Sequence, residues 1–285
     1  MNSIFIYDVF TSKKFGGNQA GVVFQEKILS YEEKQLLAKE LNFSETVFIS
    51  KSKSDIWKLE YFTPKEEIDL CGHATIAAIY ALFDEGRLTG CSEVKIETRV
   101  EILKIFLEIN EDKLEKVWME QGNGELSLEL EVSVENIIES LSLKKEDIRG
   151  DIPILKGYSG LWDLMIPVKN KDILNNIKMD IEKVKNYSEK LSVISFHPFF
   201  LDNNDVYVRN FAPIVDIIEE SATGTSNGAL AYVLEKLNFL KKEDELICHQ
   251  GESMGRPSLI LAKILSDGRI LVGGQAVRVL KGEYC

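Results

Sequence analysis

Two uncharged segments of this chain, each bounded by acidic residues, resemble one another. They span residues 69–84 and 220–235, and they align at an offset of 152 residues when Gly72 is placed on Gly224 (224 − 72 = 152). One alanine, one tyrosine and one leucine then coincide as well. Each segment is typical of a glycine-containing turn that leads into a helix with small or apolar residues on nearly every side, and such a helix is buried all round. The repeat therefore predicts two similar domains, each wrapped around one central helix.

Length, composition and charge narrow the class of protein. The 285 residues fit two domains of roughly 150 residues each, and a hydrophobic content of 45% suffices for two cores. The net charge of −12 argues against nucleic acid or an anionic membrane as a partner. Both apolar segments are shorter than the roughly 18 residues that a membrane span needs. A small anionic metabolite stays compatible, because local backbone amides outweigh a distant net charge. A homodimer is left open.

The cysteines and histidines give no support to a metal site. The four cysteines have neither zinc-ligand spacing nor a paired pattern, and the three histidines form no His-x-x-x-His pair. Residues 1–13 lack the basic and apolar regions of a secretion signal. We therefore expect reduced thiols in a cytoplasmic protein.

The pattern of the whole chain favours an α+β fold with many strands and few helices in each half. We place the domain boundary at the break after Glu120, which gives domains of residues 1–120 and 121–273. The last strand, about 274–285, is expected to cross back and complete the first domain. Helices are predicted after a capping box at Ser30 and Glu33 and over residues 133–141. Strands are predicted at 4–10, 20–24, 46–50, 57–62, 94–98, 102–109, 117–120, 154–156, 161–168, 191–196, 206–210, 246–249, 258–264 and 269–279.

The two glycine turns are candidate binding elements. A helix N-terminus presents unpaired N–H groups and partial positive charge, and glycine lets a ligand approach the backbone closely. Two such ends facing each other would hold a small carboxylate in a cleft between the domains. The alternative is that Gly72 and Gly224 merely permit tight turns. Neither turn is a Walker phosphate loop or a dinucleotide fingerprint, so no nucleotide cofactor is indicated.

Several side chains near these turns are candidates for chemistry. Glu45 lies where a loop becomes an apolar strand, and desolvation there would raise its pKa and suit it to proton transfer; the alternative is a solvated carboxylate at a strand edge. His73 would orient a ligand, and Glu220 is either a catalytic group or a partner of the helix dipole. Cys71 and Thr223 occupy equivalent positions. Because the second is threonine, a pair of thiol acid–base groups is not available.

Six groups of short motifs, in a fixed order from end to end, carry a family resemblance. They are Asp8–Thr11 with Gly17–Asn18, Asn42–Thr46, Phe62–Pro64 with Asp69–Thr75, Arg209–Pro213, Ala222–Gly224, and Gln250–Gly251 with Met254–Ser258. With these motifs the chain resembles the phenazine-biosynthesis isomerase-like (PhzF-like) family, which is related in fold to diaminopimelate epimerase. The resemblance implies two similar α+β domains, each a curled, mostly antiparallel, barrel-like sheet around a central helix, with the active site in the cleft between them.

The resemblance also implies isomerase chemistry without a cofactor or metal. In the family a glutamate matching Glu45 moves a proton between carbons of a cyclic acid, and His73 matches a site residue. We accordingly predict Glu45, His73 and Glu220 as catalytic residues. The chain departs from the family pattern at Glu220-Ser221, where Asp-Pro is common, and at Thr225, where serine is common. The predicted substrate-binding residues are Asn18, Ser44, Cys71, Gly72, Thr223, Gly224 and Thr225.

The function predicted from the sequence is a cofactor-independent isomerase that moves a proton on a small carboxylate-bearing metabolite. One alternative is an epimerase or racemase, which would need two opposed acid–base groups such as Glu45 and Glu220. Another is a non-catalytic metabolite-binding protein on the same scaffold.

Overall fold

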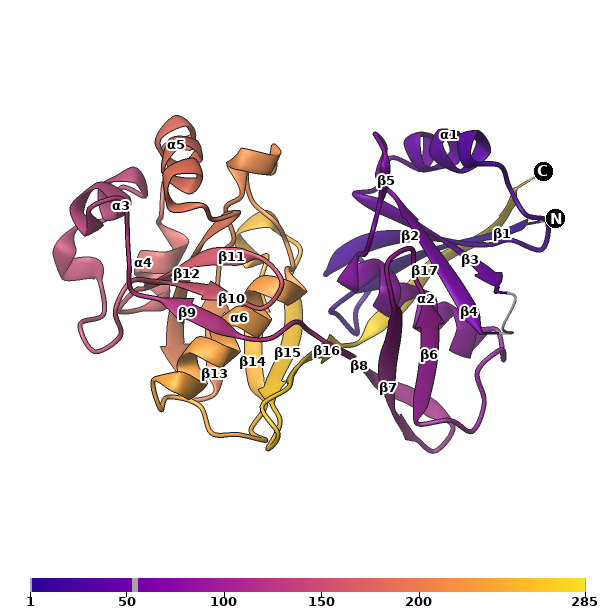
Figure 1. Cartoon of the computed structure of the whole chain (residues 1–285). Coiled ribbons are helices and arrows are strands. Elements are labelled where there is room, and N and C mark those ends of the chain that lie inside the picture. The colour runs from indigo at the N-terminus through magenta and orange to yellow at the C-terminus, as the bar shows by residue number, and fades with distance from the viewer. Residues whose placement is uncertain (1, 53–55, 285) are drawn as a thin grey trace. The chain divides into compact units, whose positions relative to one another are not determined.

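The computed structural model describes residues 2–52 and 56–284, and the chain divides into two compact units (Figure 1). The first unit consists of residues 1–120 and 273–285, and the second of residues 121–272. Strand β17 (Ala276–Tyr284) pairs antiparallel with β1 (Asn2–Val9), so the end of the chain lies in the sheet of the first unit.

The first unit is a mostly antiparallel sheet around one helix. Its strands are hydrogen-bonded in the order β17, β1, β2, β3, β4, β6, β7, β8. Strand β5 pairs with the last two residues of β4, whereas β6 pairs with its first two. The central helix α2 (Gly72–Asp84) packs against both ends of this sheet. The remaining bounds are β2 (Asn18–Phe24), α1 (Tyr31–Leu41), β3 (Glu45–Lys51), β4 (Trp57–Phe62), β5 (Glu67–Ile68), β6 (Glu93–Glu97), β7 (Ile102–Asn110) and β8 (Lys113–Glu120).

The second unit has the same plan. Its strands are hydrogen-bonded in the order β9 to β15, and the central helix α6 (Gly224–Lys236) packs against β9, β10, β11 and β15. The strands are β9 (Glu125–Ser127), β10 (Leu155–Tyr158), β11 (Trp162–Pro167), β12 (Ser195–Asp202), β13 (Asp205–Val208), β14 (Leu246–Gln250) and β15 (Ser258–Ile264). Helices α3 (Val134–Ser140), α4 (Lys171–Asn175) and α5 (Ile181–Leu191) precede β12, and β16 (Ile270–Gly274) leads back to the first unit.

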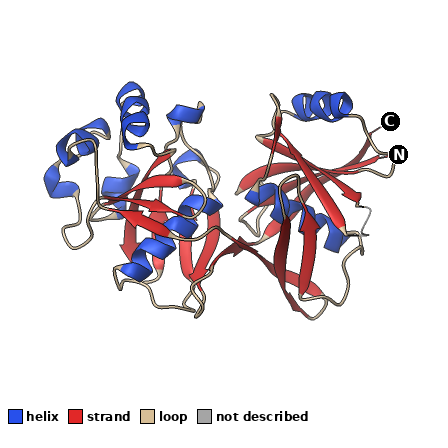
Figure 2. Cartoon of the chain, in the orientation of Figure 1, coloured by secondary structure: helices blue, strands red, loops and turns tan. Residues whose placement is uncertain are grey.

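The strand directions confirm that the two units repeat one plan. From β1 to β7 the pairings alternate antiparallel, parallel, antiparallel, parallel, antiparallel, and the pairings from β10 to β15 alternate in the same way. In each unit an 11-residue helix, α1 or α5, joins the two strands of the first parallel pair. Figure 2 shows the central helix of each unit among its strands. The predicted class, two similar α+β domains with curled sheets, is therefore confirmed.

The central helices begin where the sequence places them. Both are 13 residues long and start at the two aligned glycines, Gly72 and Gly224. Ten consecutive residues of α2, from 73 to 82, are buried, because the helix is enclosed by strands on all sides. Within the described part of the chain, no helix is both long and apolar enough to cross a membrane.

Helix α5 is the main element that the sequence analysis missed. Residues 191–196 were predicted to be a strand, but Leu191 is the last residue of α5 and β12 begins only at Ser195. Only Val184, Ser188 and Leu191 of this helix are buried, so its apolar stripe is narrow. Its start is marked by Asp180, whose side chain accepts a hydrogen bond from a backbone N–H in the first turn. The capping box at the start of α1, in contrast, is present as predicted.

Candidate active site

The strand order of the first unit brings Glu45 to the beginning of α2. Glu45 is the first residue of β3, and β3 runs parallel to β2 with Glu45 opposite Ala20. Its Oε2 atom lies 3.2 Å from Nε2 of His73, in the first turn of α2. On the other side of the ring, Nδ1 of His73 lies 3.4 Å from Sγ of Cys71. The structure thus joins three predicted site residues into one cluster, and places buried Asn18 two residues before Ala20, on the neighbouring strand.

The charges in this cluster differ from the sequence-based expectation for Glu45. Burial alone would raise the pKa of Glu45, but its contacts with His73, Ser44 and Cys71 outweigh burial and hold that pKa below its usual value. Burial likewise opposes a charge on His73, yet the sulfur of Cys71 and the carboxylate of Glu45 raise the pKa of His73 well above its usual value. The expected rise in the pKa of Glu45 is therefore wrong, because the imidazole pairs with the carboxylate. Near neutral pH the pair consists of a carboxylate and an imidazolium.

Cys71 places its sulfur on the other side of the His73 ring from Glu45. Burial, followed by the charge of Glu45, raises the pKa of Cys71. The residue is the N-cap of α2 but its side chain makes no capping hydrogen bond. Its backbone is fixed instead, since Thr75 Oγ1 donates to the Cys71 carbonyl over 2.8 Å and lies 2.7 Å from the hydroxyl of Tyr61. Hydrogen bonds therefore hold the turn before α2, while the Cys71 side chain leaves the first N–H groups of the helix uncapped.

The start of α2 also has room for a ligand. A Cβ placed on Gly72 would have no described heavy atom within 4 Å, and the residue does not need a left-handed conformation. The turn therefore does not itself require glycine. Oε2 of Glu45 and Nε2 of His73 are close but not aligned as a hydrogen bond, so neither has a hydrogen-bond partner among the described residues. Both atoms keep hydrogen-bonding capacity for a bound molecule.

Glu45, Cys71 and His73 are also three residue types that can bind a metal ion. One ligand atom each from Glu45, Cys71 and His73 lies within 4.8 Å of the others. A metal ion shared by the three residues would bind one ring nitrogen of His73, with the Glu45 carboxylate and the Cys71 sulfur close to that same nitrogen. Here the carboxylate lies next to Nε2 and the sulfur lies next to Nδ1. The arrangement fits an ion pair with a neighbouring thiol and does not fit a shared metal.

The start of α6 is held by a different set of polar residues. Thr223, the N-cap, donates from Oγ1 to Oε2 of Glu220 over 3.2 Å and from its backbone N–H to Oε1 of Gln250 over 3.2 Å. Gln250 in turn donates to the Glu220 carbonyl over 2.8 Å and accepts from Nδ2 of Asn227 over 2.9 Å. Glu220 therefore lies beside the helix end, as predicted, and is bonded to Thr223. Roles for Gln250 and Asn227 were not predicted from the sequence, although Gln250-Gly251 was among the family motifs.

Gly251 explains part of that motif. Its φ is +77°, and a Cβ there would lie 2.4 Å from the carbonyl oxygen of Arg256 and 2.6 Å from that of Ser221. Only glycine fits this close approach, which keeps Gln250 beside the start of α6. Thr225, in the first turn, is half-buried, and its carbonyl accepts a 2.8 Å hydrogen bond from Ser159.

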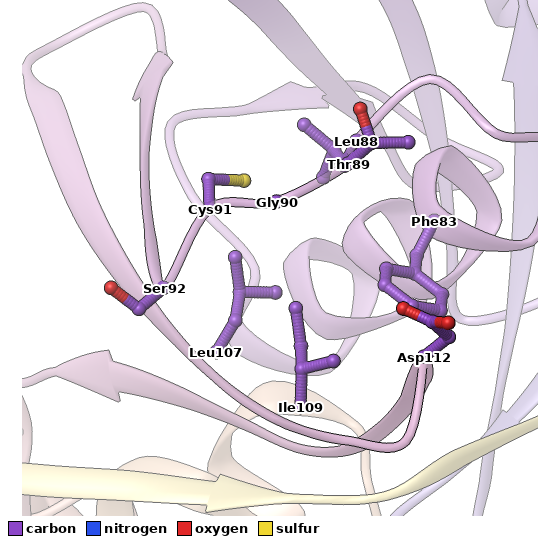
Figure 3. A pocket seen from close by; sticks show the side chains of 9 residues that line it. All are labelled: Phe83, Leu88, Thr89, Gly90, Cys91, Ser92, Leu107, Ile109 and Asp112. Atoms are coloured by element: carbon purple, nitrogen blue, oxygen red, sulfur yellow. The ribbon is translucent and has the colours of Figure 1, made fainter.

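A pocket at the other end of α2 contains none of the predicted site residues (Figure 3). Its volume is about 570 Å³. It is lined by Phe83, Leu88, Thr89, Gly90, Cys91, Ser92, Leu107, Ile109 and Asp112.

Comparison with known proteins shows which proteins this chain resembles in sequence and in fold. A phenazine biosynthesis protein of the PhzF family from Bacillus anthracis has a similar structure, with a TM-score of 0.89 and 30% identity over 100% of this chain and 99% of that one. A probable proline racemase from Agrobacterium radiobacter shares the fold alone, with a TM-score of 0.66 and 12% identity over 100% of this chain and 93% of that one. The protein named uncharacterized isomerase YddE from Escherichia coli is 31% identical over 99% of this chain and 97% of its own length.

The match to a family model is equally extensive. The model described as phenazine biosynthesis-like protein matches residues 7–282. The chain therefore belongs to the phenazine biosynthesis-like protein family, a family of isomerases. The recognition made from the short motifs is confirmed. The roles predicted for individual site residues, and the location of the site between the two units, stay predictions.

Proposed function

We propose that this isomerase moves a proton between two carbons of a small carboxylate-bearing metabolite without a cofactor. The observation that carries the proposal is the Glu45–His73 pair at 3.2 Å at the open start of α2. A proton-transfer isomerase needs a base that can later act as an acid, and a group that stabilises the negative charge formed in between. Glu45 and His73 supply both from the chain itself.

The charges of the resting pair set the direction of the first step. The Glu45 carboxylate takes a proton from a carbon of the substrate, so a C–H bond breaks and an O–H bond forms. The electron pair moves into the conjugated system next to the substrate carboxylate. The His73 imidazolium then faces a neutral Glu45 and stabilises the negative charge on the substrate. Glu45 returns the proton to a different carbon, which restores its own charge.

An anionic substrate suits both helix ends. The first N–H groups of α2 and α6 carry partial positive charge, and the N-cap residues Cys71 and Thr223 do not cap them with their side chains. Gly72 and Gly224 would let a carboxylate reach these N–H groups. We assign Thr223 and Thr225 to substrate binding and Glu220 to orienting the substrate, together with Asn18 and Ser44.

The proposal is tested by proton NMR in D₂O. The protein is incubated with a panel of small cyclic and unsaturated carboxylic acids, and each spectrum is followed for loss of C–H signals and for a new isomer. An isomerase yields a product with a shifted double bond. An epimerase would instead give inversion at the same carbon. A protein that binds a panel member, seen as a rise in melting temperature, but never exchanges or rearranges it would contradict catalysis.

A further inference from the structure

A second cluster of buried polar side chains lies behind the start of α6. Asp163 on β11 accepts a 2.6 Å hydrogen bond from Ser195, the first residue of β12. The Nδ2 group of Asn210 lies 2.8 Å from Ser195 Oγ, 3.1 Å from Ser226 Oγ and 3.1 Å from Nδ1 of His197. All five side chains are almost completely buried. Oδ2 of Asp163 and Nε2 of His197 have no hydrogen-bond partner among the described residues.

This cluster is attached to the helix end that we assign to anion binding. Ser226 is the third residue of α6, directly after Gly224 and Thr225. Its Oγ atom accepts from Nδ2 of Asn210, which also donates to Ser195 Oγ, and Ser195 in turn donates to Asp163. The position of the first turn of α6 therefore depends on the carboxyl group through Ser226, Asn210 and Ser195.

No cation balances a charge on Asp163 within the described residues. Burial lowers the pKa of His197 to about 4, so the ring is neutral and its Nδ1 accepts from Asn210. Burial, opposed by the hydrogen bonds from Ser195 and Ser226 and assisted by the charge of Glu220, raises the pKa of Asp163 to about 7. On the neighbouring strand β10 the residue opposite Asp163 is Gly157, which has no charge. The titratable neighbours are thus Glu220 and His197.

The repeat between the two units makes the contrast clear. In the first unit Glu45 heads β3 opposite Ala20, whereas in the second unit Ser195 heads β12 opposite Asp163. The carboxyl group of the second unit therefore lies on β11, the strand that pairs with β12, and not on β12 itself. At the offset that aligns the central helices, the counterpart of His73 is Thr225, so the second carboxyl group lacks an imidazolium partner.

We propose that Asp163 is a positioning residue for the start of α6, and that an anion binds there preferentially while Asp163 holds a proton. This inference rests on the proposed anion site at that helix end. A protonated Asp163 fixes the first turn without adding charge. An ionised Asp163 would place a buried negative charge within the same partial positive field that the anion needs. By reciprocity, binding of the anion raises the proton affinity of Asp163.

The test uses sulfate, whose charge is constant over the pH range. Its dissociation constant is measured by calorimetry at pH 6.0, 7.0 and 8.5 for the wild type, for Asp163→Asn and for a control, Asp172→Asn, at an exposed position of α4. Coupling between two sites is typically about 5- to 150-fold. The loss of affinity from pH 6.0 to 8.5 should therefore be at least about fivefold greater in the wild type and the control than in Asp163→Asn. Any pH dependence that arises elsewhere cancels in this comparison.

A second readout needs no variant. Calorimetry at pH 7 in buffers of different ionisation enthalpy should show that the wild type takes up protons as sulfate binds. Absence of proton uptake, or equal pH dependence in wild type and Asp163→Asn, would overturn the role of Asp163 while leaving the anion site in place. Failure of sulfate to bind the wild type at any pH would overturn the anion site and this inference with it, but it would not touch proton transfer by Glu45.

Discussion

Replacing Asp163 by asparagine should change how the stability of the second unit depends on pH. The pKa of Asp163 is raised from 3.8 to about 7 in the folded protein. A raised pKa means that the folded state holds a proton that the unfolded state releases, so stability is lost as pH rises from about 4 to about 7. With about 1.36 kcal/mol for each pH unit, the difference of about three units corresponds to about 4 kcal/mol. Asparagine cannot titrate, and Asp163→Asn should lack this loss.

The assay is urea denaturation at pH values from 4.5 to 8.5. Unfolding is monitored by hydrogen exchange of peptides from residues 121–272, so that the second unit is observed by itself. The free energy of unfolding of Asp163→Asn minus that of the wild type should rise by several kcal/mol up to about pH 7 and then level off. Asp172→Asn, an exposed control, should stay within about 0.5 kcal/mol of the wild type throughout. If the difference between Asp163→Asn and the wild type is flat with pH, Asp163 is ionised in the folded protein and our account of the cluster is wrong.

Three further outcomes follow from the structure. At saturating substrate, the turnover rate kcat should be constant around neutral pH. It should fall on the acid side only as Glu45 is protonated below its usual range and on the alkaline side as His73 is deprotonated well above its own, and a pH profile of kcat would reveal this. Gly72→Ala should fold with an unchanged melting temperature, since its Cβ meets no described atom within 4 Å. It should nevertheless raise the dissociation constant for sulfate. An unaltered dissociation constant would show that the anion does not approach α2 at this residue. Gly124→Ala should destabilise the second unit by about 1–3 kcal/mol in urea denaturation, because its Cβ would lie 2.2 Å from the ring of Tyr232, and a neutral effect would refute that packing.

The elements that the sequence predicted well are those with a strong local signal. The central helices were found because they are apolar on nearly all sides, and the start of α1 was found because Ser30 and Glu33 form a complete capping box. Helix α5 was missed because only three of its side chains are buried and its exposed face is highly polar. Short elements such as α4 and β9 contain too few residues to show a period.

The candidate site was predictable in its residues but not in its charges. Motif matches pointed to Glu45, Cys71 and His73, yet the sequence cannot show that β3 and α2 bring the carboxylate within 3.2 Å of the imidazole. That contact reverses the pKa shift expected from the apolar neighbours of Glu45. The Asp163 cluster was not predicted, although Asn210 lies in one of the family motifs. Its members come from β11, β12, the segment after β13 and the start of α6, and only the folded chain brings them together.

The central claim is that Glu45 carries the proton, and the rate of isomerisation by Glu45→Gln tests it most directly. The measurement uses the substrate found by NMR in D₂O and compares Glu45→Gln with the wild type and with Glu66→Gln, a substitution at an exposed position of the same unit. Glutamine keeps the size and polarity of the side chain but cannot exchange a proton. The account predicts that Glu45→Gln binds the substrate and loses about 10²- to 10⁴-fold in rate, while Glu66→Gln matches the wild type. A folded Glu45→Gln that turns over at the wild-type rate would contradict the account.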